Sequence, residues 1–195
     1  LSGLVGADYQ AMQPMQWPVR NGASQKRFFT DGRFFTPDGR ARFVPVAPPP
    51  PLQPAPGQLI LNTGRVRDHW HTMTRTGKAA RLSAHMAEPF VEIHPDDAGN
   101  LGIGRATLVR LENRHGTALV RALISDRQRR GSVFVPMHWT DQFSASARID
   151  ALVTGQTDPQ SGQPALKMAQ VSVEPAMAKW YGFAISRARP DLAGV

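Results

Sequence analysis

The segment LNTGRVRDHWHTMTRTGK, from Leu61 to Lys78, gathers side chains that could hold an anionic molecule rich in nitrogen and oxygen. Thr63 and Gly64 follow an apolar lead-in, and such a position suits phosphate, because glycine admits a close backbone approach and hydroxyl and N–H groups can cradle the anion. Arg65 adds a planar guanidinium suited to phosphate or to a purine edge. The same spacing is also typical of a solvated glycine turn, and it does not decide between the two.

Two histidines, His69 and His71, flank Trp70 in this segment. If the segment were a strand, residues i and i+2 would face the same way and the pair could chelate a metal. The other histidines are scattered along the chain and supply no third and fourth ligand, so we expect no metal site. Imidazoles that bond to a heterocycle beside a tryptophan wall are the better interpretation, and surface histidines beside a half-buried tryptophan remain the alternative.

The chain contains no self-sufficient catalytic set. His138 and Asp141 lie three residues apart and could form an acid–base pair, but no serine sits in a nucleophile elbow and no second carboxylate is placed for glycoside hydrolysis. The absence of cysteine excludes a thiolate nucleophile, a disulfide scaffold, a cysteine zinc site and an iron–sulfur cluster within these 195 residues. It also fits a reducing compartment.

The formal net charge of +8 comes from arginines spread along the chain. Such a surface attracts nucleic acid, acidic membrane or an anionic cofactor, or it is simply solvated. The basic cluster Ser125–Gly131 contains no aromatic residue for base stacking, which favours a solvated loop. A basic β-barrel that binds nucleic acid remains the hypothesis from another functional class. No run approaches the roughly 18 apolar residues of a membrane span, so we expect no membrane partner.

The elements that must position these residues begin after a proline-rich stretch. Residues 1–44 show no sustained periodicity but contain the turn sequences TDGR and TPDGR. Residues 45–57, PVAPPPPLQPAPG, predict an extended interdomain linker. The chain starts at leucine and ends in DLAGV, and we expect it to be a piece of a longer polypeptide.

Residues 58–175 predict about six short strands with one or two helical turns. A β-hairpin is expected over 107–125, where Val109 and Leu111 alternate with charged residues and the pattern resumes with Leu119, Arg121 and Leu123 after a turn at 113–116. The remaining strands are predicted at QLILNT, PFVEIH, GSVFVP and KMAQVSVEP, and Pro95 marks a helix start. Closing these strands into a small barrel would remove exposed edges and collect long polar loops at one end.

Four motifs then occur in order: LNTGRVRDHWHTMTRTG, EPFVEIHPDDAGNLGI, VFVPMHW and TDPQSGQPALKMAQVSV. This succession resembles the C-terminal cofactor-binding domain of the molybdopterin oxidoreductases, the dimethyl sulfoxide reductase superfamily, and within it the large subunit of assimilatory nitrate reductase. The resemblance implies a mainly β fold, a six-stranded double-psi β-barrel over residues 58–175. Residues 1–44 would be the tail of the preceding domain, and residues 176–195 the short amphipathic start of a C-terminal extension.

The resemblance also implies which residues contact a molybdenum bis(molybdopterin guanine dinucleotide) cofactor. Met137 and His138 would lie over the substrate funnel, and no catalytic residue or metal ligand is expected in this piece. Two departures concern Ser144, where relatives often have asparagine, and Arg105-Ala106, where many have Gly-Asp. The expected cofactor contacts are Thr63, Gly64, Arg65, His69, Trp70, His71, Thr72, Thr74, Ser144 and Lys167.

For the whole protein, the resemblance implies a cytoplasmic nitrate reductase that converts nitrate to nitrite and is not active as this piece alone. A 4Fe-4S cluster would lie in an upstream domain of the same polypeptide. Electrons would come from a reductase subunit or from a ferredoxin or flavodoxin. A formate dehydrogenase or another oxyanion reductase is the alternative within the superfamily, because the barrel is shared.

Overall fold

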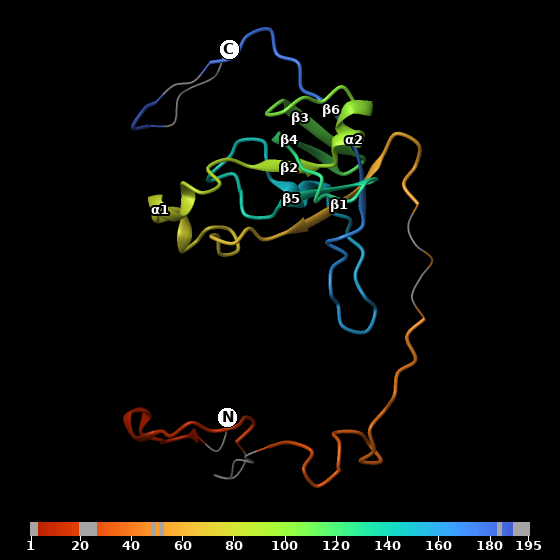
Figure 1. The fold of residues 1–195 in the computed structure, drawn as a ribbon. Helices are drawn as coiled ribbons and strands as arrows, with labels where there is room; N and C mark the ends of the chain where they lie inside the picture. Colours follow the sequence, from red (N-terminus) through yellow and green to blue (C-terminus); the bar gives the residue numbers. More distant parts are fainter. Residues whose placement is uncertain (1–3, 20–26, 48–49, 51–52, 183–184, 189–195) are drawn as a thin grey trace. The chain divides into compact units, whose positions relative to one another are not determined.

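The computed structural model of the chain describes residues 4–19, 27–47, 50, 53–182 and 185–188 (Figure 1). The chain divides into two units, Leu1–Pro50 and Pro51–Val195, and the division falls within the proline-rich segment 45–57. Parts of the predicted segments lie outside the described residues, namely 1–3, 20–26, 48–49, 51–52, 183–184 and 189–195. The boundaries predicted at 44, 57 and 175 stay predictions.

The first unit contains the two predicted turns. Gly32 has φ +69° and donates from its N–H to the carbonyl of Phe29, and Gly39 has φ +70° and donates to the carbonyl of Thr36. Both glycines therefore adopt the left-handed conformation that the turn chemistry predicts. The described residues of this unit form no strand and no helix longer than the single turn of 3₁₀ helix Tyr9–Ala11 (η2).

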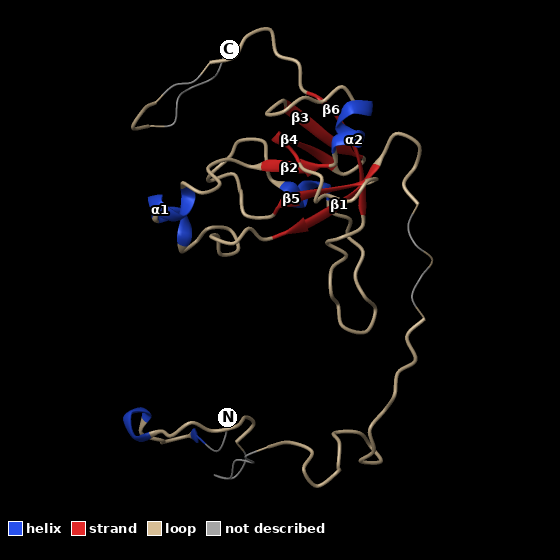
Figure 2. Cartoon of the chain, in the orientation of Figure 1, coloured by secondary structure: helices blue, strands red, loops and turns tan. Residues whose placement is uncertain are grey.

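The second unit is built on six strands, which Figure 2 shows gathered together. They pair in the order β1-β5-β2-β4-β3-β6 and close into a barrel. This confirms the prediction of a mainly β fold with a six-stranded barrel and short helices. The strands are β1 (Leu59–Gly64), β2 (Phe90–Ile93), β3 (Leu108–Asn113), β4 (Gly116–Ile124), β5 (Ser132–Pro136) and β6 (Ala169–Pro175).

The pairing pattern has an internal twofold relation. β1 is parallel to β5 and antiparallel to β6, and β4 is likewise parallel to β2 and antiparallel to β3. Exchanging β1 with β4, β2 with β5 and β3 with β6 therefore reproduces every pairing, because β2–β5 and β3–β6 map onto themselves. Two interlocked three-strand halves of this kind constitute the double-psi arrangement that the resemblance implies.

The barrel interior is filled by small and β-branched side chains on alternating strand positions. On β4 the buried residues are Ala118, Val120 and Ala122, while Leu119 and Leu123 face outward. The smaller residues of this strand therefore face the interior of the barrel. The rest of the core comprises Leu61, Val91, Ile93, Val109, Leu111, Val133, Val135, Ala169, Val171 and Val173, with Ala98, Ile103, Ala147, Ile149 and Leu152 from the connections.

The helices are short. The helix α2 (Pro95–Asn100) begins at Pro95, as predicted, and His94 caps it by accepting a hydrogen bond from the N–H of Asp96. The turn of 3₁₀ helix η4 (Ile149–Leu152) packs on β4. Within the described ranges, no helix is long and apolar enough to cross a bilayer. Residues 176–182 and 185–188 form neither helix nor strand, so the predicted amphipathic start is irregular where it is described.

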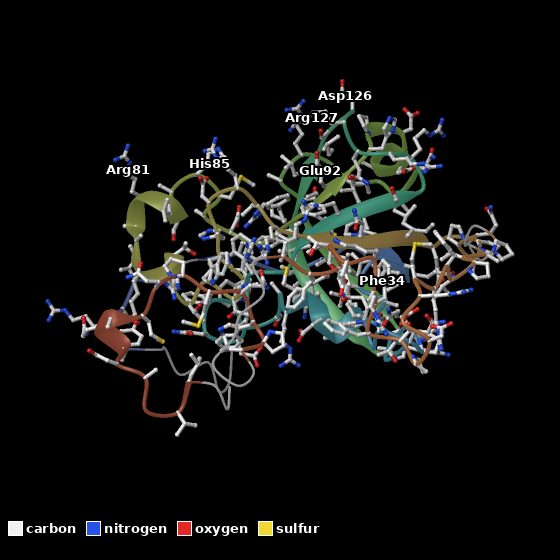
Figure 3. All side chains as sticks on the ribbon, turned by 90° about the horizontal axis from the view of Figure 1, so that it is seen from below. Phe34, Arg81, His85, Glu92, Asp126 and Arg127 are labelled. Carbon is white, nitrogen blue, oxygen red and sulfur yellow. The ribbon has the colours of Figure 1, made fainter. Side chains whose placement is uncertain are left out.

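The strand directions decide which loops meet. Since β1 and β5 are parallel, with Gly64 opposite Pro136, the loops that follow both strands leave the same end of the barrel. β6 is antiparallel to β1, with Ala169 opposite Leu61, so the segment before β6 reaches this end too. β4 runs the other way and its following loop lies at the opposite end, where Asp126 and Arg127 project outward (Figure 3).

Two glycines of this unit predict opposite responses to alanine. Gly131 has φ +74° and open space around an added Cβ, so Gly131→Ala should destabilise the chain by roughly 1–2 kcal/mol through backbone strain alone. Gly99 lies within α2, also in open space, and Gly99→Ala should stabilise the chain by roughly 0.5–1 kcal/mol. Urea unfolding of the two variants measures both effects, and equal effects of the same sign would contradict the assigned backbone conformations.

Candidate functional site

The end of β1 is joined to the segment before β6 by two side chains. The hydroxyl of Thr63 donates to the carbonyl of Leu166 at 2.8 Å, and Nζ of Lys167 donates to the carbonyl of Thr63. Thr63 is buried, and Lys167 is exposed apart from this bond. The structure thus brings these two predicted contacts together, although they lie 104 positions apart in the sequence.

Gly64 lies against the neighbouring strand. A Cβ added at Gly64 would stand 2.9 Å from Cε2 of Phe134, closer than side-chain carbons approach one another. The carbonyl of Gly64 accepts from the N–H of Met137 at 2.9 Å and so continues the β1–β5 pairing past the end of both strands. The sequence predicted a close backbone approach at this glycine, and in this structure the group that approaches is an aromatic ring of the barrel.

His138, which follows β5, is fully buried and uses both ring nitrogens. Nε2 accepts from the N–H of Val66 at 2.8 Å, and Nδ1 bonds to the carbonyl of His71. Since one nitrogen accepts and a carbonyl only accepts, the ring carries its proton on Nδ1. Burial lowers the pKa of His138 below its ordinary value of 6.5, with the nearby His69, Arg65 and His71 acting in the same direction and the His71 carbonyl opposing them.

His69 is also buried, and its partner is a residue that the sequence did not single out. Nδ1 of His69 lies 3.2 Å from the hydroxyl of Thr76, and the same hydroxyl accepts from the N–H of Trp70 at 3.2 Å. The His69 ring packs edge-on against Trp139 with ring centres 5.6 Å apart. Thr76 begins the turn η3 (Thr76–Lys78), and a threonine among several others carries no sequence signal of this bridging role.

Arg65, Trp70 and His71 form an exposed group. The guanidinium of Arg65 stands 5.3 Å from the centre of the Trp70 ring, and its Nη2 lies 3.3 Å from Nδ1 of His71. The Trp70 and His71 rings are 4.4 Å apart at 72°. Trp70 is 45% exposed, so this group offers a flat apolar ring and a cation side by side. The hydroxyl-bearing residues Thr72 and Thr74 of the same loop are exposed as well.

The loop after β5 contains the other predicted contacts. Met137 is half-buried against the core, and Ser144 is half-buried with its N–H donated to the carbonyl of Thr140. Asp141 pairs with Arg148 at 3.2 Å, whereas both ring nitrogens of His138 bond to the backbone of the loop after β1. The possible acid–base pair between His138 and Asp141 is therefore not formed.

The histidine pair does not have the geometry of a chelate. The segment after Gly64 is a series of turns rather than a strand, and His71 has φ +36°. As a result His69 is buried and His71 exposed, so the expectation that i and i+2 would face the same way on a strand does not apply. Among the described residues, no group of three or more metal-ligating side chains converges.

Next to this loop, Asp68 accepts from Arg67 at 3.0 Å and lies 2.6 Å from Nδ1 of His85. The hydrogen bond from Arg67, with a further contribution from His85, holds the pKa of Asp68 below its ordinary value of 3.8. These contacts tie the loop to the segment around the short helix α1 (Ala80–Ser83), where Arg81 and His85 project outward (Figure 3).

At the opposite end, the basic cluster 125–131 is a loop in which two arginines have local partners. Nε of Arg127 lies 3.4 Å from the Ser125 hydroxyl, and Arg130 pairs with Asp96 at 3.3 Å. Among the described residues, these arginines do not stack on an aromatic ring. The geometry agrees with the solvated loop that the sequence favours over a nucleic-acid surface.

Comparison with known proteins defines the class of this barrel. The sequence profile of a family described as "Molydopterin dinucleotide binding domain" matches residues 59–170, which include β1 to β5 and the start of β6. The chain therefore belongs to the molybdopterin dinucleotide-binding family. A solved structure, acetylene hydratase from Pelobacter acetylenicus, shares the fold with a TM-score of 0.53 and 21% identity, over 60% of this chain and 18% of that one.

The relatives include nitrate reductases. The chain is 39% identical to a nitrate reductase of Klebsiella oxytoca over 96% of its length and 36% identical to the assimilatory nitrate reductase catalytic subunit of Bacillus subtilis over 76%. It is also 32% identical, over 82% of its length, to the F420-dependent formate dehydrogenase subunit alpha of Methanocaldococcus jannaschii. The chain spans only 22%, 21% and 24% of these three relatives.

The residues present fit a dinucleotide that carries pyrophosphate and a fused heterocycle. The exposed guanidinium of Arg65 suits an anionic oxygen, and the adjacent Trp70 ring suits a flat heterocycle. By contrast, the Thr63 hydroxyl and Lys167 Nζ already bond to carbonyls, which makes these two residues part of the scaffold of the site. The individual contacts predicted from the resemblance stay predictions.

The contact between Gly64 and Phe134 predicts a rescue experiment. Gly64→Ala should destabilise the chain by roughly 1–3 kcal/mol, because its Cβ would overlap the edge of the Phe134 ring and force that side chain to shift. Phe134→Leu in the same chain should restore part of that loss by removing the overlapping ring edge. Urea unfolding of both single variants and the double variant gives the coupling, and additive effects would refute the contact.

Proposed function

We propose that this chain is the cofactor-binding domain of a molybdenum-dependent assimilatory nitrate reductase, which reduces nitrate to nitrite. The observation that carries the proposal is the exposed group of Arg65, Trp70 and His71, held at one end of a barrel whose family binds molybdopterin dinucleotide. The similarity to nitrate reductases over 96% and 76% of the chain supports the choice of substrate.

In this proposal the chain binds and orients the cofactor and performs no chemistry with its own side chains. Arg65 donates to an anionic oxygen of bis(molybdopterin guanine dinucleotide), Trp70 supplies an apolar wall, and Thr72, Thr74 and Ser144 supply hydroxyls. Met137, which is half-buried beside the core, would lie over the substrate funnel. The bound group supplies the molybdenum at which oxygen-atom transfer takes place.

The rest of the enzyme would lie in other domains of the same polypeptide, since this chain spans only 22% and 21% of the two nitrate reductases it resembles. We place a 4Fe-4S cluster in an upstream domain, in keeping with the absence of cysteine from these residues. A reductase subunit, a ferredoxin or a flavodoxin would deliver electrons, and the enzyme would be cytoplasmic.

Formate oxidation is the second candidate, and the 32% identity to a formate dehydrogenase subunit favours it. The barrel binds the cofactor and leaves substrate choice largely to other parts of the protein, so the two functions can share this domain.

The substrate assignment predicts the activity of the full-length enzyme. Purified with its cofactor and given a reduced dye as electron source, the enzyme should consume nitrate and release nitrite in equal amounts. It should not reduce a dye in the presence of formate. Formate-dependent dye reduction without nitrate turnover would assign the second function and reject the first, and neither activity would reject both.

The site assignment predicts the cofactor content of variants of the same enzyme. Arg65→Ala should lower bound molybdenum several-fold, because a lost charge-assisted contact costs about 1.5–3 kcal/mol. Lys167→Ala should lower it as well, because it removes the bond to the Thr63 carbonyl that holds the end of β1. Arg127→Ala is the matched control, since it removes an exposed arginine at the opposite end of the barrel. Molybdenum per protein is measured by elemental analysis. Wild-type content in both site variants would contradict the assignment, as would an equal loss in the control.

A further inference from the structure

The loop that follows β1, residues 65–75, has little regular structure of its own. Between Gly64 and η3 the backbone makes two internal hydrogen bonds, His69 N–H to the Val66 carbonyl at 3.4 Å and Met73 N–H to the Trp70 carbonyl at 2.7 Å. Two residues, His71 and Met73, have positive φ, at +36° and +60°. Residues other than glycine rarely adopt this backbone conformation, so contacts from outside the loop must stabilise it.

His138 provides such a contact at two points. Its ring lies beneath the loop and bonds at one edge to the N–H of Val66 and at the other to the carbonyl of His71. These two backbone groups bracket the stretch that carries Trp70. The buried Met73 side chain and the Thr76 hydroxyl hold the C-terminal half of the loop, whereas His138 connects its N-terminal half to β5.

We propose that His138 is a positioning residue: by bridging Val66 N–H and the His71 carbonyl, it fixes the loop in the conformation that presents Arg65, Trp70 and His71 to the cofactor. This inference rests on the proposed function. This positioning role differs from the predicted position of His138 over a substrate funnel, since the side chain is fully buried and both ring nitrogens are already bonded within the domain.

The bridge needs the neutral ring. Protonation of Nε2 would place a second donor against the N–H of Val66 and would break that hydrogen bond. His69, His71 and Arg65 face the ring, and each disfavours a further positive charge. Because burial lowers the pKa of His138 below 6.5, the bridge contributes its full stability above pH 6.5 and loses it as pH falls from there through the folded-state pKa. Cofactor retention should weaken over the same range.

The first test measures the loop directly in the full-length chain without cofactor. Amide hydrogen exchange of Val66 should become about tenfold faster in His138→Phe, which removes both bonds and keeps a ring in the cavity. His138→Gln offers one donor and one acceptor and should restore part of the protection. His115→Phe is the matched control, since His115 is exposed in the β3–β4 turn, and it should leave the exchange of Val66 unchanged.

The second test measures cofactor release from the holoenzyme between pH 5 and pH 8. Wild-type release should accelerate as pH falls below 6.5, and His138→Gln should release faster at pH 7 but without that acceleration, although His69 and His71 remain. A merely space-filling role would leave the shape of this pH profile unchanged in the variant.

The outcomes separate the inference from the proposed function. Unchanged Val66 exchange in folded His138→Phe, or an unchanged pH profile in His138→Gln, overturns the positioning role. If His138→Phe does not fold, the comparison of His138→Gln with wild type decides by the same criteria. Faster exchange of Val66 together with wild-type molybdenum in Arg65→Ala would instead uphold the bridge and reject the proposed cofactor contact.

Discussion

The parallel pairing of β1 with β5 is the constraint on which the site depends. Two parallel neighbours release their following loops at one end, so the segments after Gly64 and after Pro136 emerge side by side. Closure of the barrel brings the start of β6 to the same place through the antiparallel pairing of β6 with β1. Three segments far apart in the sequence thus share one end of a barrel without free edges.

At that end the side chains divide into an inner and an outer set. Thr63, Lys167, His69 and His138 bond to backbone carbonyls, an N–H or another side chain of the domain, and they stabilise an irregular loop. Residues of the outer set, such as Arg65, Trp70 and His71, are exposed and contact mainly one another. This division favours the binding of a large anion, because the exposed groups are preorganised before the ligand binds.

Much of the fold could be predicted from the sequence. The alternation of Val109 and Leu111 located the hairpin, and proline at position 95 located the start of α2, because these signals are local. On β4, however, Ala118, Val120 and Ala122 occupy the interior, and Leu119 and Leu123 face outward. The space available inside a closed six-stranded barrel decided that orientation, and the sequence of a single strand does not indicate how large this space is.

For the site, the sequence by itself determined the donors and their order: threonine, glycine and arginine directly after a strand, then histidine, tryptophan and histidine. Only the tertiary structure decided which of these residues bond within the domain and which are exposed. Thr76, Phe134 and Leu166 act through contacts whose partners are chosen by loop conformation and strand register. His69 and His71 face different environments because positive φ at His71 breaks the strand-like alternation. Residue type sets what a side chain can bond to, and the packing of distant segments sets what it does bond to.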